Sequence, residues 1–105
     1  MDYALLKVGD AASIVTQVEI TKWGGKVVVS CLYDPLESCR PYRLIFEDCH
    51  EITMRVINPE SRQDATADLI GFSIGEECHH TPAVITTDIF EISILYGSFL
   101  VQKDC

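Results

Sequence analysis

Cysteine and histidine stand next to each other at two places in the chain, Cys49-His50 and Cys78-His79-His80. Thiolate and imidazole groups are the ligands that zinc and similar transition metals prefer in proteins. Zinc sites usually draw on spaced pairs, however, because adjacent side chains of an extended segment point to opposite sides. The candidate metal ligands are therefore Cys49, His50, Cys78, His79 and His80. Their adjacent spacing is more typical of polar loops than of a zinc site. We expect no resident metal and no other cofactor.

The same thiols and imidazoles could act as nucleophile and base in a hydrolase. No nucleophile elbow, glycine-rich phosphate loop or HExxH helix stands beside them in the sequence. Glu47, Glu51 and Glu91 could form a carboxylate pair of the kind that glycosidases use, but alternation places them on an outer face. We assign no catalytic residue, and a small hydrolase-like enzyme is the third of our three functional interpretations.

Composition narrows the class of protein and of partner. The chain has 105 residues, 48% of them hydrophobic, which predicts one ordered all-β domain spanning residues 1–105. The net charge of −8, from 16 acidic and 8 basic residues, argues against nucleic acid and anionic membranes as partners. Five cysteines, an odd number, without a signal-peptide pattern argue against a disulfide framework, so we expect a cytoplasmic protein.

A first β-hairpin is predicted around Gly24-Gly25, because a two-residue type I′ turn needs two residues that tolerate positive φ. This turn pairs Trp23 with Lys26 and Ile20 with Val29. The apolar residues that then share one face are Ile14, Val18, Ile20, Val27, Val29, Cys31 and Tyr33. A one-residue slip would expose this whole set, so the face is strongly specified.

Two further hairpins are predicted from the same alternation. Phe46 pairs with Ile52 around a loop at 48–50, and Ile94 pairs with Val101 around a Gly97-Ser98 turn in which Tyr96 meets Phe99. Additional strands are predicted at 67–74 and 83–87. About eight short strands without βαβ alternation predict an antiparallel sandwich or partly open barrel, built from hairpins, with at most two short helical turns.

The middle hairpin forces like charges together, since it places Arg43 opposite Arg55 and Glu47 opposite Glu51. One interpretation is that each arginine takes a carboxylate from a third strand, with Glu91 or Asp68 as the acid. The other is that Arg43 and Arg55 form a small-molecule or anion site, with Glu47, Glu51 and Glu91 as further ligand-binding residues. This site is our second functional interpretation.

A second face of the sheet keeps several apolar side chains in otherwise polar rows, namely Val28, Leu32, Ile45, Leu95 and Leu100. Trp23, beside the first turn, could serve as an aromatic anchor. We therefore take Trp23, Leu95 and Leu100 as candidate interface residues. The preferred interpretation is a non-catalytic interaction module that forms a homodimer or binds another protein, through an edge strand or this second face.

Overall fold

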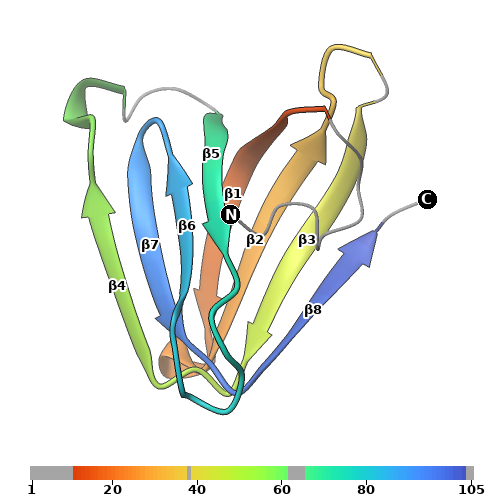
Figure 1. Cartoon of the computed structure of the whole chain (residues 1–105). Coiled ribbons are helices and arrows are strands. Elements are labelled where there is room, and N and C mark those ends of the chain that lie inside the picture. Colours follow the sequence, from red (N-terminus) through yellow and green to blue (C-terminus); the bar gives the residue numbers. More distant parts are fainter. Residues whose placement is uncertain (1–10, 38, 62–65, 104–105) are drawn as a thin grey trace.

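The computed structural model describes residues 11–37, 39–61 and 66–103, and its main feature is one antiparallel sheet of eight strands (Figure 1). The strands are β1 (Ser13–Thr21), β2 (Lys26–Tyr33), β3 (Arg40–Glu47), β4 (Glu51–Val56), β5 (Ala67–Ser73), β6 (Ala83–Thr87), β7 (Phe90–Leu95) and β8 (Ser98–Lys103). Their spatial order is β4-β7-β6-β5-β1-β2-β3-β8, so β4 and β8 are the two edges of an open sheet. Two short 3-10 turns, η2 (Lys22–Gly24) and η3 (Pro59–Ser61), are the helical elements of the described residues. The all-β antiparallel prediction is confirmed.

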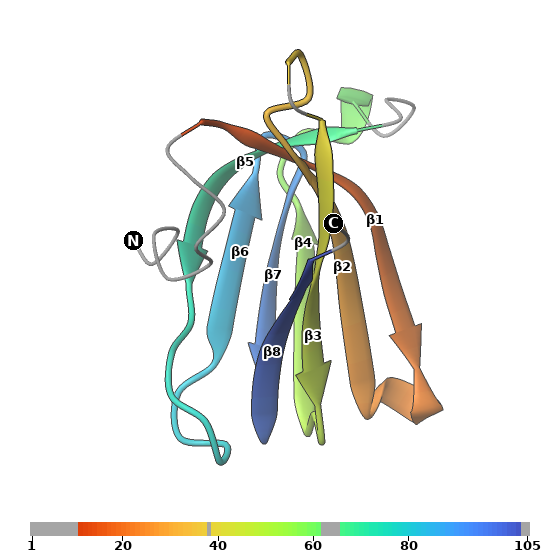
Figure 2. The same cartoon turned by 90° about the vertical axis from the view of Figure 1, so that its right-hand side faces the viewer.

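The sheet folds over where β5 meets β1. Only two residue pairs join these strands, Ile14 with Asp68 and Val15 with Ala67. Figure 2 shows β1 arching across the top of the molecule toward β5. The sheet therefore has two halves, β4-β7-β6-β5 (the β4 half) and β1-β2-β3-β8 (the β8 half). They face each other across an apolar core.

Aromatic contacts in this core join the two halves. Phe72 of β5 lies 6.0 Å from Phe99 of β8, centroid to centroid, and Phe46 of β3 packs edge-on at 5.2 Å against Tyr96, which follows β7. Each strand contributes one inner row to the core and one outer row to the surface. The innermost side chains include Val27, Val29, Tyr42, Leu44, Phe46, Ile85, Ile92, Ile94 and Tyr96. No helix in the described part of the chain is long and apolar enough to cross a membrane.

The first hairpin is confirmed, but its register differs from the predicted one. Thr21 pairs with Lys26 and Ile20 with Val27, because Lys22 and Trp23 take positive φ values of 53° and 59° and join the turn. The shift is by two residues, so Ile20 and Val29 still share a face. Trp23 stands outside the strand, fully exposed.

Ile14 does not lie on the predicted face of β1. A bulge between Val15 and Gln17 changes the alternation, so that Val15 pairs with Cys31 and is buried, while Ile14 pairs with Leu32 on the outer side. A bulge inserts one residue and shifts every side chain beyond it to the other face.

The two other predicted hairpins are wrong in their partners. Phe46 pairs with Val27 and Phe99 rather than with Ile52, and Ile94 pairs with Ile52 and Ala83 rather than with Val101. The chain instead crosses from one half to the other after β3 and again after β7. The predicted inner faces are nevertheless kept, because both halves turn their apolar rows toward the same core.

These crossings separate the charges that the middle hairpin would have brought together. Arg43 pairs with Ser30 and Gln102 on the outer face of the β8 half, whereas Arg55 lies on the outer face of the β4 half. The two outer faces point to opposite sides of the molecule. The structure therefore does not pair Arg43 with Arg55, as the predicted anion site assumed, and the predicted opposition of Glu47 and Glu51 is wrong.

Candidate functional site

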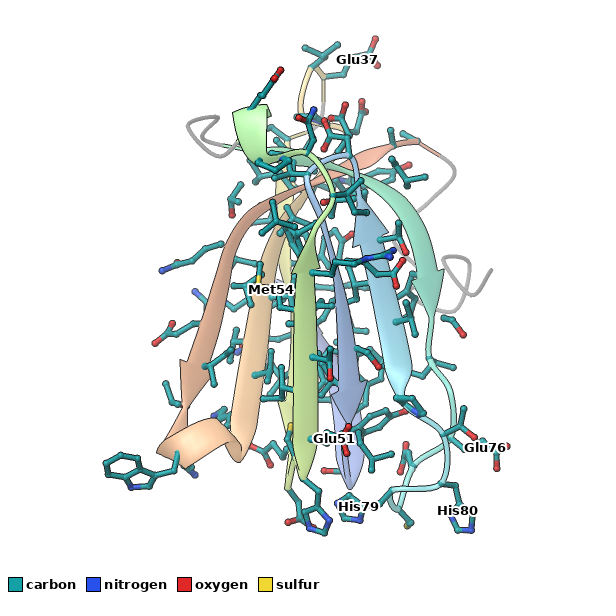
Figure 3. The ribbon with its side chains drawn as sticks, turned by 90° about the vertical axis from the view of Figure 1, so that its left-hand side faces the viewer. Glu37, Glu51, Met54, Glu76, His79 and His80 are labelled. Atoms are coloured by element: carbon teal, nitrogen blue, oxygen red, sulfur yellow. The ribbon has the colours of Figure 1, made fainter. Side chains whose placement is uncertain are left out.

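The edge strand β4 exposes apolar side chains that belong to its inner row. Ile52, Met54 and Val56 pair with Ile94, Ile92 and Phe90 of β7, all three buried, and so face inward. Met54 is nevertheless 50% exposed and Val56 36% exposed. We call the three residues Ile52, Met54 and Val56 the β4 edge. In Figure 3, Met54 and Glu51 project from opposite sides of β4.

The main-chain groups along this edge have a defined pattern. Ile57 N–H donates a hydrogen bond of 2.7 Å to Ile89 O, which extends the register between β4 and β7 by one pair. Since main-chain groups alternate in direction along a strand, Thr53 and Arg55 direct theirs to β7. Ile52, Met54 and Val56 direct theirs to the open side. No other described strand pairs with β4 on that side.

The outer row of β4 carries Glu51, Thr53 and Arg55. Arg55 lies opposite Glu91 of β7, with a guanidinium-to-carboxylate distance of 3.7 Å, and Thr86 Oγ1 donates to the same carboxylate at 3.5 Å. The interpretation that an arginine takes a carboxylate from another strand is thus confirmed for Arg55 and Glu91. Glu47 forms an ion pair with Lys26 at 3.6 Å instead.

A surface pocket of about 290 Å³ lies beside the start of β4. It is lined by Glu51, Thr53, His79, His80, Pro82, Ser93 and Leu95. Leu95 thus belongs to the outer face of the β4 half. Leu100, which is 50% exposed, pairs with Ile45 on the outer face of the β8 half. Leu95 and Leu100 do not form the one continuous surface that the sequence predicted.

Asp48, His50 and His79 come together at the end of the molecule where β4 begins. One nitrogen or oxygen atom from each side chain lies within 4.8 Å of the other two. The two imidazole rings are stacked, with centroids 3.5 Å apart and planes 6° from parallel. The Asp48 carboxylate lies 3.8 Å from His50 Nε2 and 3.7 Å from His79 Nε2, and His79 Nε2 also lies 2.6 Å from the Asp48 carbonyl oxygen. We call these three residues the loop cluster.

Main-chain hydrogen bonds from one segment hold both loops of the cluster. His50 N–H donates to Leu95 O at 2.8 Å, and His79 N–H donates to Tyr96 O at 2.9 Å. Cys78 N–H donates to Gly97 O at 3.0 Å, while Gly97 N–H donates to the end of β3 at 3.0 Å. The segment that crosses from β7 to β8 therefore positions the two loops against each other.

Gly97 makes the close approach of Asp48 feasible. A Cβ atom at Gly97 would lie 2.9 Å from both Cβ and Oδ2 of Asp48, closer than side-chain atoms pack. Asp48, Cys78 and His79 all adopt left-handed φ angles, of 54°, 59° and 61°. The backbone is not extended there, so the argument that adjacent side chains diverge does not apply to these loops.

The cysteines of the two loops take no part in the cluster. Cys49 is buried and its thiol donates to Phe46 O at 3.5 Å. Burial raises the pKa of the Cys49 thiol, and the nearby charges of Asp48 and Glu47 raise it further. Cys78 is exposed and His80 points away from the cluster (Figure 3). Asp48 is the member that the sequence did not single out as a ligand, although its position two residues before His50 is a usable signal.

A scan of protein-family models found no match to this chain, and a search of curated proteins found no similar sequence.

Proposed function

We propose that this chain is a non-catalytic interaction module that forms a two-fold dimer, with β4 of one protomer pairing antiparallel to β4 of a second copy. Exposed edges with apolar side chains are templates for such pairing. The observation that carries the proposal is the charge order along the outer row of β4, with Glu51 and Arg55 placed symmetrically about Thr53.

A two-fold axis through Thr53 would place Glu51 opposite the partner's Arg55 and Arg55 opposite the partner's Glu51. The same register sets Ile52 against the partner's Met54, so that apolar side chains meet on the inner row. Ile52 and Met54 are also the residues whose main-chain groups point to the open side. The register therefore supplies about four main-chain hydrogen bonds as well as two opposite-charge pairs.

The opposite edge of the sheet supports self-pairing less well. Lys103 of β8 pairs with Tyr42, so it falls on the inner row of that edge strand. An inward-directed charge on an edge strand discourages a second strand from docking, because docking would remove the charge from water. The outer row of β8 contributes Leu100, without the complementary charges that β4 carries.

Charge reversal tests this register. Glu51→Arg gives a chain with two arginines on the outer row, and Arg55→Glu gives a chain with two acids. Each variant alone should dimerise about tenfold more weakly than the unaltered chain, because like charges then oppose each other twice. An equimolar mixture should form a heterodimer, since both contacts become complementary again. Sedimentation velocity at low salt measures all three samples.

The double variant Glu51→Arg/Arg55→Glu is the matched control, because it restores opposite charges within one chain. It should dimerise as the unaltered protein does. A mixture that dimerises no better than the separate variants would overturn the proposed register. Circular dichroism checks that each variant folds. Thr53→Lys provides an independent test of the register. It sets two lysines opposite each other on the two-fold axis and should also weaken the dimer.

A further inference from the structure

The loop cluster combines two imidazoles and one carboxylate on loops that the fold itself holds in place. We propose that Asp48, His50 and His79 bind a single divalent transition-metal ion of the zinc class. The three residues of the loop cluster come from two loops that are far apart in the sequence. One loop, 48–50, precedes β4, and the other, 76–81, joins β5 to β6. The site does not depend on the proposed dimer, because the residues of the β4 edge are not among its ligands.

The donor set selects the class of metal. Two neutral imidazole nitrogens with one carboxylate oxygen suit zinc, cobalt and nickel, which accept mixed nitrogen and oxygen ligands. Calcium and magnesium prefer sites made of oxygen atoms and are disfavoured here. Three protein ligands also leave at least one coordination position for water.

The donor atoms are already close together, and the two stacked imidazole rings must tilt for both nitrogen lone pairs to reach one ion. The donor atoms already lie within 4.8 Å of one another, whereas ligands on one zinc ion lie about 3–4 Å apart, as metal-ligand distances of about 2 Å imply. The main-chain bonds from Leu95, Tyr96 and Gly97 fix the two loops without a metal. Loops that are already ordered lose less conformational entropy when the metal binds.

Binding has a definite proton balance at His79. Without metal, an Nε2–H of His79 donates to the Asp48 carbonyl oxygen at 2.6 Å. A metal at Nε2 takes the place of that proton, which moves to Nδ1 of the same ring, so the imidazole stays neutral and no net proton is released. Binding therefore exchanges the hydrogen bond between His79 and the Asp48 carbonyl oxygen for a bond between His79 Nε2 and the metal.

The surrounding charge favours a cation. Asp48 is 72% exposed, His50 is 59% exposed and His79 is 22% exposed, so an ion can reach the cluster from solvent. The chain carries a net charge of −8, and the Glu51 side chain lines the pocket next to His79. These charges raise the local concentration of cations.

Isothermal titration with zinc chloride, supported by the visible spectrum of added cobalt, tests the proposal. The host is Cys39→Ser/Cys78→Ser/Cys105→Ser, so that the exposed or terminal thiols do not bind the metal. We expect one ion per chain and cobalt absorption bands typical of a nitrogen and oxygen site. Absence of saturable binding at tens of micromolar protein would overturn the proposal.

Matched histidine variants locate the site. His50→Gln and His79→Gln should each weaken zinc binding by at least about tenfold, as losing a ligand costs no less than losing a group that orients one. His80→Gln, adjacent but outside the cluster, should bind as the host does. An equal loss in His80→Gln would contradict the assignment. Because a variant could fail to fold, amide shifts of the host on zinc addition provide a second measure, and shifts away from 47–51, 77–80 and 95–98 would also contradict it.

Discussion

The Tyr42 hydroxyl donates a hydrogen bond of 2.8 Å to Ser13 Oγ, across the inner face of β2, with both residues almost completely buried. This bond ties β3 to the part of β1 that arches toward β5. The bond lies within the β8 half and holds the end of β1 that leads to the β1–β5 junction.

Tyr42→Phe removes this bond while keeping the ring. We expect a loss of about 1–3 kcal/mol in the free energy of unfolding, because buried polar groups that lose a partner are costly. Urea titration measures the change. Ser13→Ala and the double variant complete a mutant cycle, and purely additive effects would show that the two side chains do not interact.

Ile94 provides a test of the core, since it is completely buried between Ile52 and Ala83. Ile94→Ala should reduce the free energy of unfolding by about 2–5 kcal/mol. Ile70→Ala makes the same chemical change at a strand residue that is 57% exposed, and it should cost less than about 1 kcal/mol. Similar losses at both positions in urea titration would show that the inner row is misassigned.

We expect the free energy of unfolding to depend on alkaline pH through the Cys31 thiol. Burial raises the pKa of its thiol from 9.0 to about 12, although a hydrogen bond with Tyr42 lowers it in part. The folded chain thus retains a proton that the unfolded chain releases. This contribution to stability is complete below pH 9.0 and is lost as the pH rises toward about 12.

Urea titrations at about pH 8 and about pH 10.5 compare the unaltered chain with Cys31→Ala. The unaltered chain should lose more of its free energy of unfolding, by about 1–2 kcal/mol. Cys39→Ala is the control, because that thiol is exposed and its removal should leave the pH dependence unchanged. Equal pH dependence in the Cys31→Ala chain and the unaltered chain would refute the role of Cys31.

Alternation in the sequence predicted the apolar side of the hairpin strands, except at Ile14 before the bulge in β1, but it could not predict the partner strands. Phe46 and Ile52 both lie on inner rows, as expected, yet they belong to different halves. A hairpin and a crossing satisfy the same alternation when both inner rows face one core. The Gly97-Ser98 dipeptide therefore indicated a turn without showing where the next strand goes.

Local backbone geometry explains the remaining differences. The bulge after Val15 follows two adjacent apolar residues, so either one could continue the inner row. The loop cluster depends on left-handed backbone at Asp48 and His79 and on the crossing before Gly97, and periodicity reports none of these. Cys-His pairs drew attention to the correct loops, but the pairing of Asp48 with two histidines needed the three-dimensional structure.

Sedimentation equilibrium of the unaltered, reduced chain at micromolar concentration tests the dimer most directly. The β4 pairing predicts a concentration-dependent species at twice the chain mass of 11.7 kDa, and Met54→Pro should abolish it. Proline there removes an N–H that points to the open side, so the β4–β7 ladder and the fold should persist. A single species of 11.7 kDa throughout the micromolar range would contradict the proposed self-association.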